Sequence, residues 1–136
     1  MIGVGLLVLR LVLGVIFIGH GAQKLFGSFG GPRLSGFAKM LEQLGVKPAK
    51  PMAILAGLAE FVGGILVMLG FLTPLAALAL IVVMIVAVLT VHLKNGFFNT
   101  NGGYEFNLAL AGMALTLLIA GAGAYSLDSA LGILWQ

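Results

Sequence analysis

Residues 2–22 read IGVGLLVLRLVLGVIFIGHGA, an apolar run that sets the class of fold for the chain. Its length matches the roughly 20 residues that a helix rising ~1.5 Å per residue needs to cross a hydrocarbon layer of ~30 Å. Arg10 and His20 are its ionisable exceptions. We therefore predict a membrane-spanning helix here, continuing toward Phe26.

Three further apolar stretches meet the same length requirement: residues 52–72, 74–92 and 105–124. The composition agrees, since 61% of the residues are hydrophobic and only 8% are charged, whereas ~25% is usual in a soluble domain. This excludes a soluble globular enzyme, a disordered chain and a nucleic-acid-binding protein. We predict an all-α integral membrane protein, a four-transmembrane-helix bundle in which residues 1–136 form a single domain.

The long connection between the first two spans, residues 27–51, has room for a helix of its own. We predict a short amphipathic interfacial helix that lies on the membrane surface and stops near Gly45. The apolar residues that recur at helical spacing in it are Leu34, Phe37, Leu41 and Leu44. Residues 126–135 are predicted to form a second surface segment, which contains Asp128 and is anchored by Trp135.

The basic residues outside the spans all fall on one side of the predicted bundle, opposite the N-terminus. Lys and Arg collect in cytoplasmic loops of membrane proteins. The sequence therefore predicts that this side is cytoplasmic and that both termini lie outside. The residues that create this bias are Lys24, Arg33, Lys39, Lys47, Lys50 and Lys94.

Arg10, His20, Glu60 and His92 are ionisable residues within or at the ends of apolar segments. A charge in the bilayer core costs at least ~2.5–3.5 kcal/mol, so such residues are normally paired and often functional. Counting ~1.5 Å per residue places Arg10 about 6 Å from Glu60 along the membrane normal, and each histidine about 9 Å from Glu60. Both an Arg10–Glu60 pair and a histidine–Glu60 pair are compatible with these depths. We favour one shared catalytic cluster with Arg10 as its permanent cation and the histidines as its titratable members, against a purely structural Arg10–Glu60 pair.

The loop at residues 95–105 reads NGFFNTNGGYE and emerges beside His92. A turn with an aromatic belt would explain its glycines and rings. It would also serve as one wall of a binding site, with rings against a flat head group and polar side chains on its oxygens. The side chains predicted to bind substrate are Lys24, Asn95, Phe98, Tyr104 and Glu105.

The chain contains no cysteine. This removes thiol redox chemistry and cysteine-held metal clusters, and we expect no metal site. His20 and His92 at one depth would suit either a proton relay to a quinone or the axial positions of a haem, and haem is the less favoured of the two.

Several motifs together resemble the DoxX family of small bacterial membrane proteins: LRLVLGVIFIGHGAQKLFG at residues 9–27, GLAEFVGGILVMLGFLTPLAAL at 57–78, VHLKNGFF at 91–98, GGYEF at 102–106 and GAGAYSLD at 121–128. The resemblance implies four membrane helices in the bacterial cytoplasmic (inner) membrane. It also implies a link to quinone-dependent oxidation, with which some relatives are associated. The matching residues include Arg10, His20, Lys24, Glu60, His92, Asn95, Tyr104 and Glu105.

The favoured hypothesis is therefore a membrane subunit of a quinone-linked oxidoreductase system that binds a quinone at an intramembrane polar site. Its electrons would come from an oxidoreductase partner. Two alternatives stay open: a non-catalytic scaffold that anchors a soluble redox enzyme, and a small proton-coupled transporter. Membrane lipid is an expected partner, and the small-residue helix faces are compatible with a homo-oligomer.

Overall fold

A computed structural model describes residues 1–133, and in this part of the chain the regular structure is entirely helical. The longer helices are α1 (Ile2–Phe26), α2 (Arg33–Gln43), α3 (Ala49–Leu69), α4 (Thr73–Ala87) and α5 (Glu105–Ala120). The short elements are η1 (Ser28–Gly30), η2 (Val88–His92), η3 (Leu93–Asn95), η4 (Asn99–Asn101) and α6 (Leu127–Ala130).

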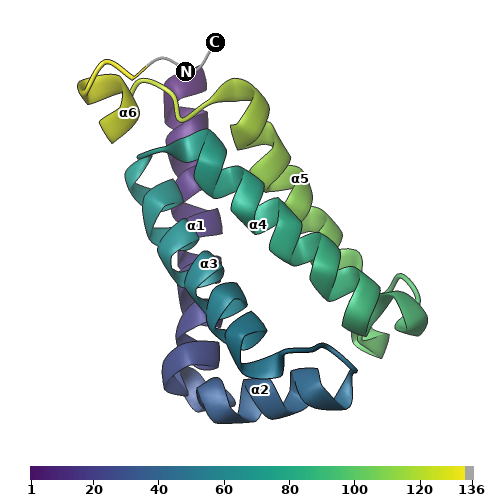
Figure 1. Ribbon diagram of the computed structural model, residues 1–136. Coiled ribbons are helices and arrows are strands. Elements are labelled where there is room, and N and C mark those ends of the chain that lie inside the picture. The colour runs from purple at the N-terminus through teal and green to yellow at the C-terminus, as the bar shows by residue number, and fades with distance from the viewer. Residues whose placement is uncertain (134–136) are drawn as a thin grey trace.

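The helices α1, α3, α4 and α5 run alongside one another, and α2 lies across one end of the bundle (Figure 1). The N-terminus and α6 lie at the opposite end. The predicted amphipathic helix is confirmed as α2, which turns Phe37 and Leu41 toward α3 and the bundle. Trp135, the predicted anchor of the last segment, lies outside the described residues.

Within residues 1–133, the helical stretches long and apolar enough to cross a membrane are Ile2–Phe26, Ala49–Leu69 and Thr73–Asn95, with 25, 21 and 23 residues. The third runs from α4 through η2 and η3. The fourth predicted span is shorter than expected, because α5 has 16 residues and rises only ~24 Å. It ends before Gly121, whose φ of 77° leaves the helical region. The prediction of four spans is thus confirmed for three helices, with α5 packed beside them.

Glycines set the register between α1 and α3. A Cβ atom added to Gly64 would lie 2.9 Å from the backbone nitrogen of Ile18, and one added to Gly21 would lie 2.5 Å from that of Phe61. Only glycine permits such an approach of two backbones, and close approach is what holds helices together in lipid. The two helices are therefore aligned with Gly14 beside Gly64 and Gly21 beside Phe61.

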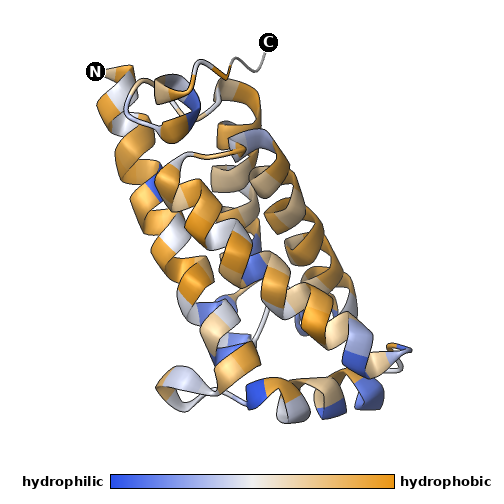
Figure 2. Ribbon diagram, turned by 60° about the vertical axis from the view of Figure 1, so that its left-hand side comes forward, coloured by the Kyte–Doolittle hydropathy of each residue, from blue (hydrophilic) through white to orange (hydrophobic). Residues whose placement is uncertain are grey.

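The core and the outer surface of the bundle are both apolar. Leu13, Phe17 and Leu80 are at most 1% exposed in the core. The outward faces carry exposed Val8, Leu78 and many similar residues, and Figure 2 shows hydrophobic residues along the shafts and hydrophilic ones gathered on α2. A soluble monomer rarely exposes so large a continuous apolar surface, so the outside of these helices is suited to lipid.

Candidate functional site

The most deeply buried acidic residue, Glu60, pairs with Lys24. Lys24 Nζ on the last turn of α1 donates to Glu60 Oε1 on α3 at 2.6 Å. The Glu60 side chain is 1% exposed and that of Lys24 is 23% exposed. Phe37 of α2 covers the ammonium group, with Nζ 5.0 Å from the ring centroid, a distance at which the ring attracts a cation. Three helices thus enclose one ion pair.

The second carboxylate oxygen of Glu60 is in a different situation. Oε2 is buried and has no hydrogen-bond partner among the described residues. A buried acceptor without a partner carries its full desolvation cost, so in most proteins such an atom has a proton, a water or a ligand group to satisfy it. Oε2 is therefore the atom of this pair at which proton exchange or ligand binding can occur.

Arg10 does not take part in this pair, which corrects the predicted cluster. Its side chain is fully buried, and it donates to the backbone oxygen of Met68 at 3.2 Å and to that of Tyr125. Met68 lies eight residues beyond Glu60 on α3, or ~12 Å along the helix. The depth count failed because it aligned the helices by their predicted ends, whereas the glycine contacts set their actual register.

Asp128 was predicted on a surface segment and is instead 3% exposed. Its carboxylate accepts hydrogen bonds from the backbone nitrogens of Leu72 at 2.8 Å and Thr73 at 3.0 Å, at the start of α4. It also acts electrostatically on Arg10. Arg10 and Asp128 therefore form a second polar cluster, which ties the segment after α5 to the α3–α4 turn at the end opposite α2.

His92 and the predicted binding loop form a third group. His92 Nδ1 lies 2.8 Å from the Gly102 carbonyl oxygen, to which Asn95 Nδ2 also donates at 3.1 Å. Glu105 Oε2 accepts from the backbone nitrogen of Asn99 at 3.3 Å. These hydrogen bonds close the loop on itself, so His92 has Gly102 as its partner rather than Glu60.

The aromatic side chains of the same loop contact one another. The Phe97 ring meets Phe98 and Tyr104 edge-on, with centroids 5.2 Å and 5.6 Å away. His20 lies one turn before Lys24 on α1, and its ring centroid is 6.0 Å from that of Phe106 on α5. The predicted catalytic residues thus have separate partners in the structure: His20 lies beside Phe106, and Glu60 pairs with a predicted binding residue, Lys24.

Asn107 is a buried polar residue that the sequence interpretation did not single out. It is 8% exposed, lies on α5, and donates through Nδ2 to the Met84 sulfur of α4 at 3.6 Å. The signal that could have found it is an amide in the first turn of an apolar helix. A search for metal ligands gives no candidate site: within residues 1–133, no group of three His, Asp or Glu side chains is placed to hold an ion.

Together these features define a small helical membrane protein that encloses a lysine–glutamate pair at one end and an arginine–aspartate cluster at the other. The DoxX family model matches residues 5–93. The chain belongs to the DoxX family, as its motifs indicated.

Curated relatives extend over most of the chain. Inner membrane protein YqjF of Escherichia coli is 32% identical, covering 97% of this chain and 95% of the relative. "Putative oxidoreductase CatD" of Bacillus subtilis is 30% identical, covering 92% and 85%. An uncharacterized protein of Haemophilus influenzae is 35% identical, covering 89% and 86%. No solved structure matches the chain.

Proposed function

We propose that this chain is the membrane subunit of a quinone-linked oxidoreductase system and that it binds a quinone or similar lipophilic redox molecule at the Lys24–Glu60 pair. The observation that carries the proposal is the buried Glu60 carboxylate, with Lys24 on one oxygen and no partner among the described residues on the other. Ionisable groups kept inside a membrane protein usually serve a pathway for protons or substrate. The name of the relative CatD points to the same class of chemistry.

A quinone takes up an electron pair and two protons when it becomes the quinol. In the proposed role, Glu60 Oε2 gives or accepts a proton, and the Lys24 ammonium stabilises negative charge on the carboxylate or on a ring oxygen. In the same role, His20, which is exposed one turn before Lys24 on α1, exchanges protons between this pair and the outside of the bundle. The electrons come from a partner oxidoreductase.

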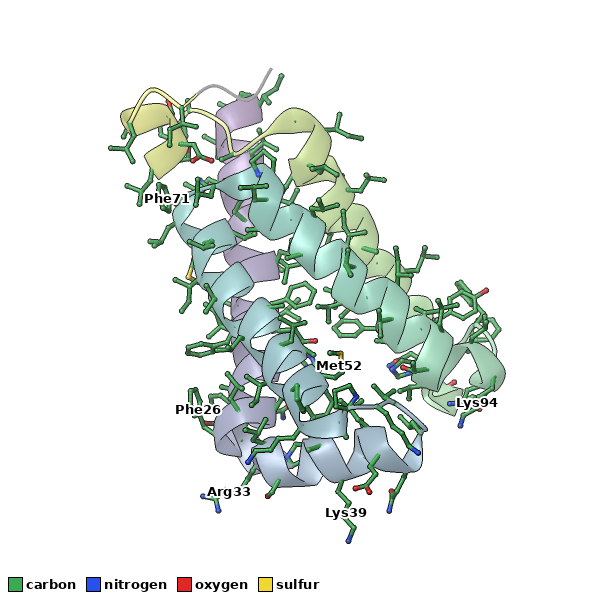
Figure 3. All side chains as sticks on the ribbon, viewed as in Figure 1. Phe26, Arg33, Lys39, Met52, Phe71 and Lys94 are labelled. Carbon is green, nitrogen blue, oxygen red and sulfur yellow. The ribbon has the colours of Figure 1, made fainter. Side chains whose placement is uncertain are left out.

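The orientation of the chain is part of the proposal. Arg33, Lys39 and Lys94 project from the end of the molecule formed by α2 and the α4–α5 connection (Figure 3). By the distribution of basic residues in membrane proteins, this end faces the cytoplasm and the end with α6 faces outward. The relatives called inner membrane proteins support the bacterial inner membrane as the location.

Binding of decylubiquinone to the purified chain tests this role. We expect a quinone-dependent rise in the unfolding midpoint of the wild type, and binding about tenfold weaker or more in Glu60→Gln, because a hydrogen bond to a charged group is lost. The double variant Lys24→Met/Glu60→Gln removes both charges and so leaves no unpaired ion to disturb folding. Glu42→Gln, exposed on α2, is the matched control. An unchanged affinity in both Glu60 variants, or no shift in the wild type, would refute the assignment.

One observation favours the scaffold as a second candidate. The basic side chains Arg33, Lys39, Lys47, Lys50 and Lys94 are all exposed at the α2 end, where they form a surface for an acidic soluble partner. The transporter alternative is less favoured, because the Lys24 ammonium beside Glu60 would repel a cationic substrate from the remaining carboxylate oxygen.

A further inference from the structure

The net charge of this protein is concentrated in residues 27–51. This segment holds four basic residues and one acidic residue, Glu42, a balance equal to the +3 of the whole chain, because the other three basic and three acidic residues cancel. Its basic residues are Arg33, Lys39, Lys47 and Lys50. All four are exposed, and in the part of the chain that the structure describes none of them forms an ion pair. The α2 end therefore carries positive charge that the described residues do not neutralise.

The turn between α1 and α2 has a strained backbone. Phe29 and Arg33 have φ angles of 54° and 63°, in a region that bulky residues rarely adopt. The last turn of α1 holds this conformation: Gln23 Nε2 donates to the Phe29 carbonyl oxygen at 3.4 Å, and a Cβ atom added to Gly31 would lie 2.5 Å from Gln23 Cα. No residue of η1 is buried, so the strain does not serve the core. Strain of this kind is concentrated at ligand-binding and other functional sites.

This turn presents a guanidinium group and a phenyl ring at the end of a membrane-spanning helix. A Cβ atom added to Gly27 would lie 2.5 Å from Arg33 Cγ, so the Arg33 stem is packed there, and its side chain extends away from the bundle (Figure 3). Phe29 is 82% exposed, and Phe26, the last residue of α1, is exposed as well. Apolar rings beside basic side chains are typical of segments that lie in the lipid interface. An acidic soluble partner would match the charges but not rings at this depth.

We propose that the turn at residues 27–33 binds an anionic phospholipid of the leaflet at the α2 end. The Arg33 guanidinium donates to the phosphate oxygens, for which its planar set of N–H groups is suited, and the Phe29 ring lies against the upper part of the acyl chains. The exposed lysines of α2 and of the α2–α3 connection attract the anionic head group. The site goes beyond the proposed function, because neither Lys24 nor Glu60 takes part in it.

Native mass spectrometry of the purified full chain in a neutral detergent tests the site. The probes are phosphatidylglycerol and phosphatidylcholine with the same acyl chains, so that they differ in head-group charge. We expect the wild type to bind phosphatidylglycerol about tenfold more tightly than phosphatidylcholine. Arg33→Gln should reduce this preference about three- to tenfold, the effect of one charged hydrogen bond. Arg33→Lys should keep part of it, because an ammonium group retains the charge without the planar N–H pair.

Matched controls separate this site from charge in general and from soluble anions. Lys94→Gln removes an exposed cation outside the segment and should leave the lipid preference unchanged. Glycerol 3-phosphate, which has the phosphate without acyl chains, should not displace phosphatidylglycerol at equal concentration; equal displacement would assign a soluble phosphate ligand instead and overturn the proposal. Equal affinity of the wild type for the two lipids would also overturn it and leave the basic charges to an acidic protein partner. So would an unchanged preference in Arg33→Gln, or an equal loss in Lys94→Gln.

Discussion

Individual charges in this protein have specific and different partners. Glu60 forms an ion pair with Lys24. Arg10 donates hydrogen bonds to the backbone oxygens of Met68 and Tyr125 and is attracted electrostatically by Asp128. Removing one member of a buried pair is costly, because the other charge stays behind in an apolar environment. Asp128 has an additional structural task, because it receives two backbone N–H groups at the start of α4.

Asp128→Ala should therefore destabilise the fold by ~1–3 kcal/mol, the combined effect of losing a helix cap and the anion near Arg10. Asp128→Asn should be milder, since its amide oxygen can still accept one of these hydrogen bonds. Thermal unfolding in detergent measures both. Ser129→Ala, at the exposed neighbouring position, is the control, and equal midpoints for Asp128→Ala and Ser129→Ala would contradict the capping role.

Among the helices, the α1–α3 contact positions the candidate site. Glycine contacts along it set which residues of the two helices are level, and this register brings Lys24 to Glu60 and Arg10 to Met68. The glycine contacts between α1 and α3 thus also determine the electrostatic pairing.

Gly21→Ala should weaken this contact strongly, because the new methyl group would lie 2.5 Å from the Phe61 backbone nitrogen and the helices would have to separate. Gly19→Ala is the matched control on the same helix, since an added Cβ there meets nothing within 4 Å. Alanine favours helix over glycine by about 1 kcal/mol. We expect a lower unfolding midpoint for Gly21→Ala and an unchanged or higher one for Gly19→Ala; the reverse order would argue against glycine-set register.

At the level of the complete bundle, polarity differs between the two ends. The α2 end carries exposed lysines and Arg33, while the end with α6 encloses Arg10 and Asp128 within the protein. This asymmetry is the physical basis of the proposed orientation.

Single-cysteine labelling in intact cells checks the orientation without background, because the chain contains no cysteine. Ser35→Cys on α2 should react with a membrane-impermeant maleimide only after the membrane is permeabilised. Ala130→Cys on α6 should react from outside. Both positions are exposed, so a reversed pattern would invert the topology.

The helices and α2 were predictable because hydropathy, helix length and amphipathic spacing are properties of neighbouring residues along the chain. The end of α5 was placed too late, since Ala122 and Ala124 continue the apolar pattern while Gly121 has already left the helix. Asp128 was misplaced because a short polar segment after the last span looks like a surface segment until its contacts are known.

The sequence determined that this is a helical membrane protein of the DoxX family with a basic end, and it identified Glu60 and Lys24 as residues of interest. The tertiary structure alone determined their pairing, the separate clusters of Arg10 and His92, and the strained turn that carries Phe29 and Arg33. The physical reason is that pairing depends on helix register, which is set by glycine backbones touching across α1 and α3 rather than by where each apolar stretch begins and ends.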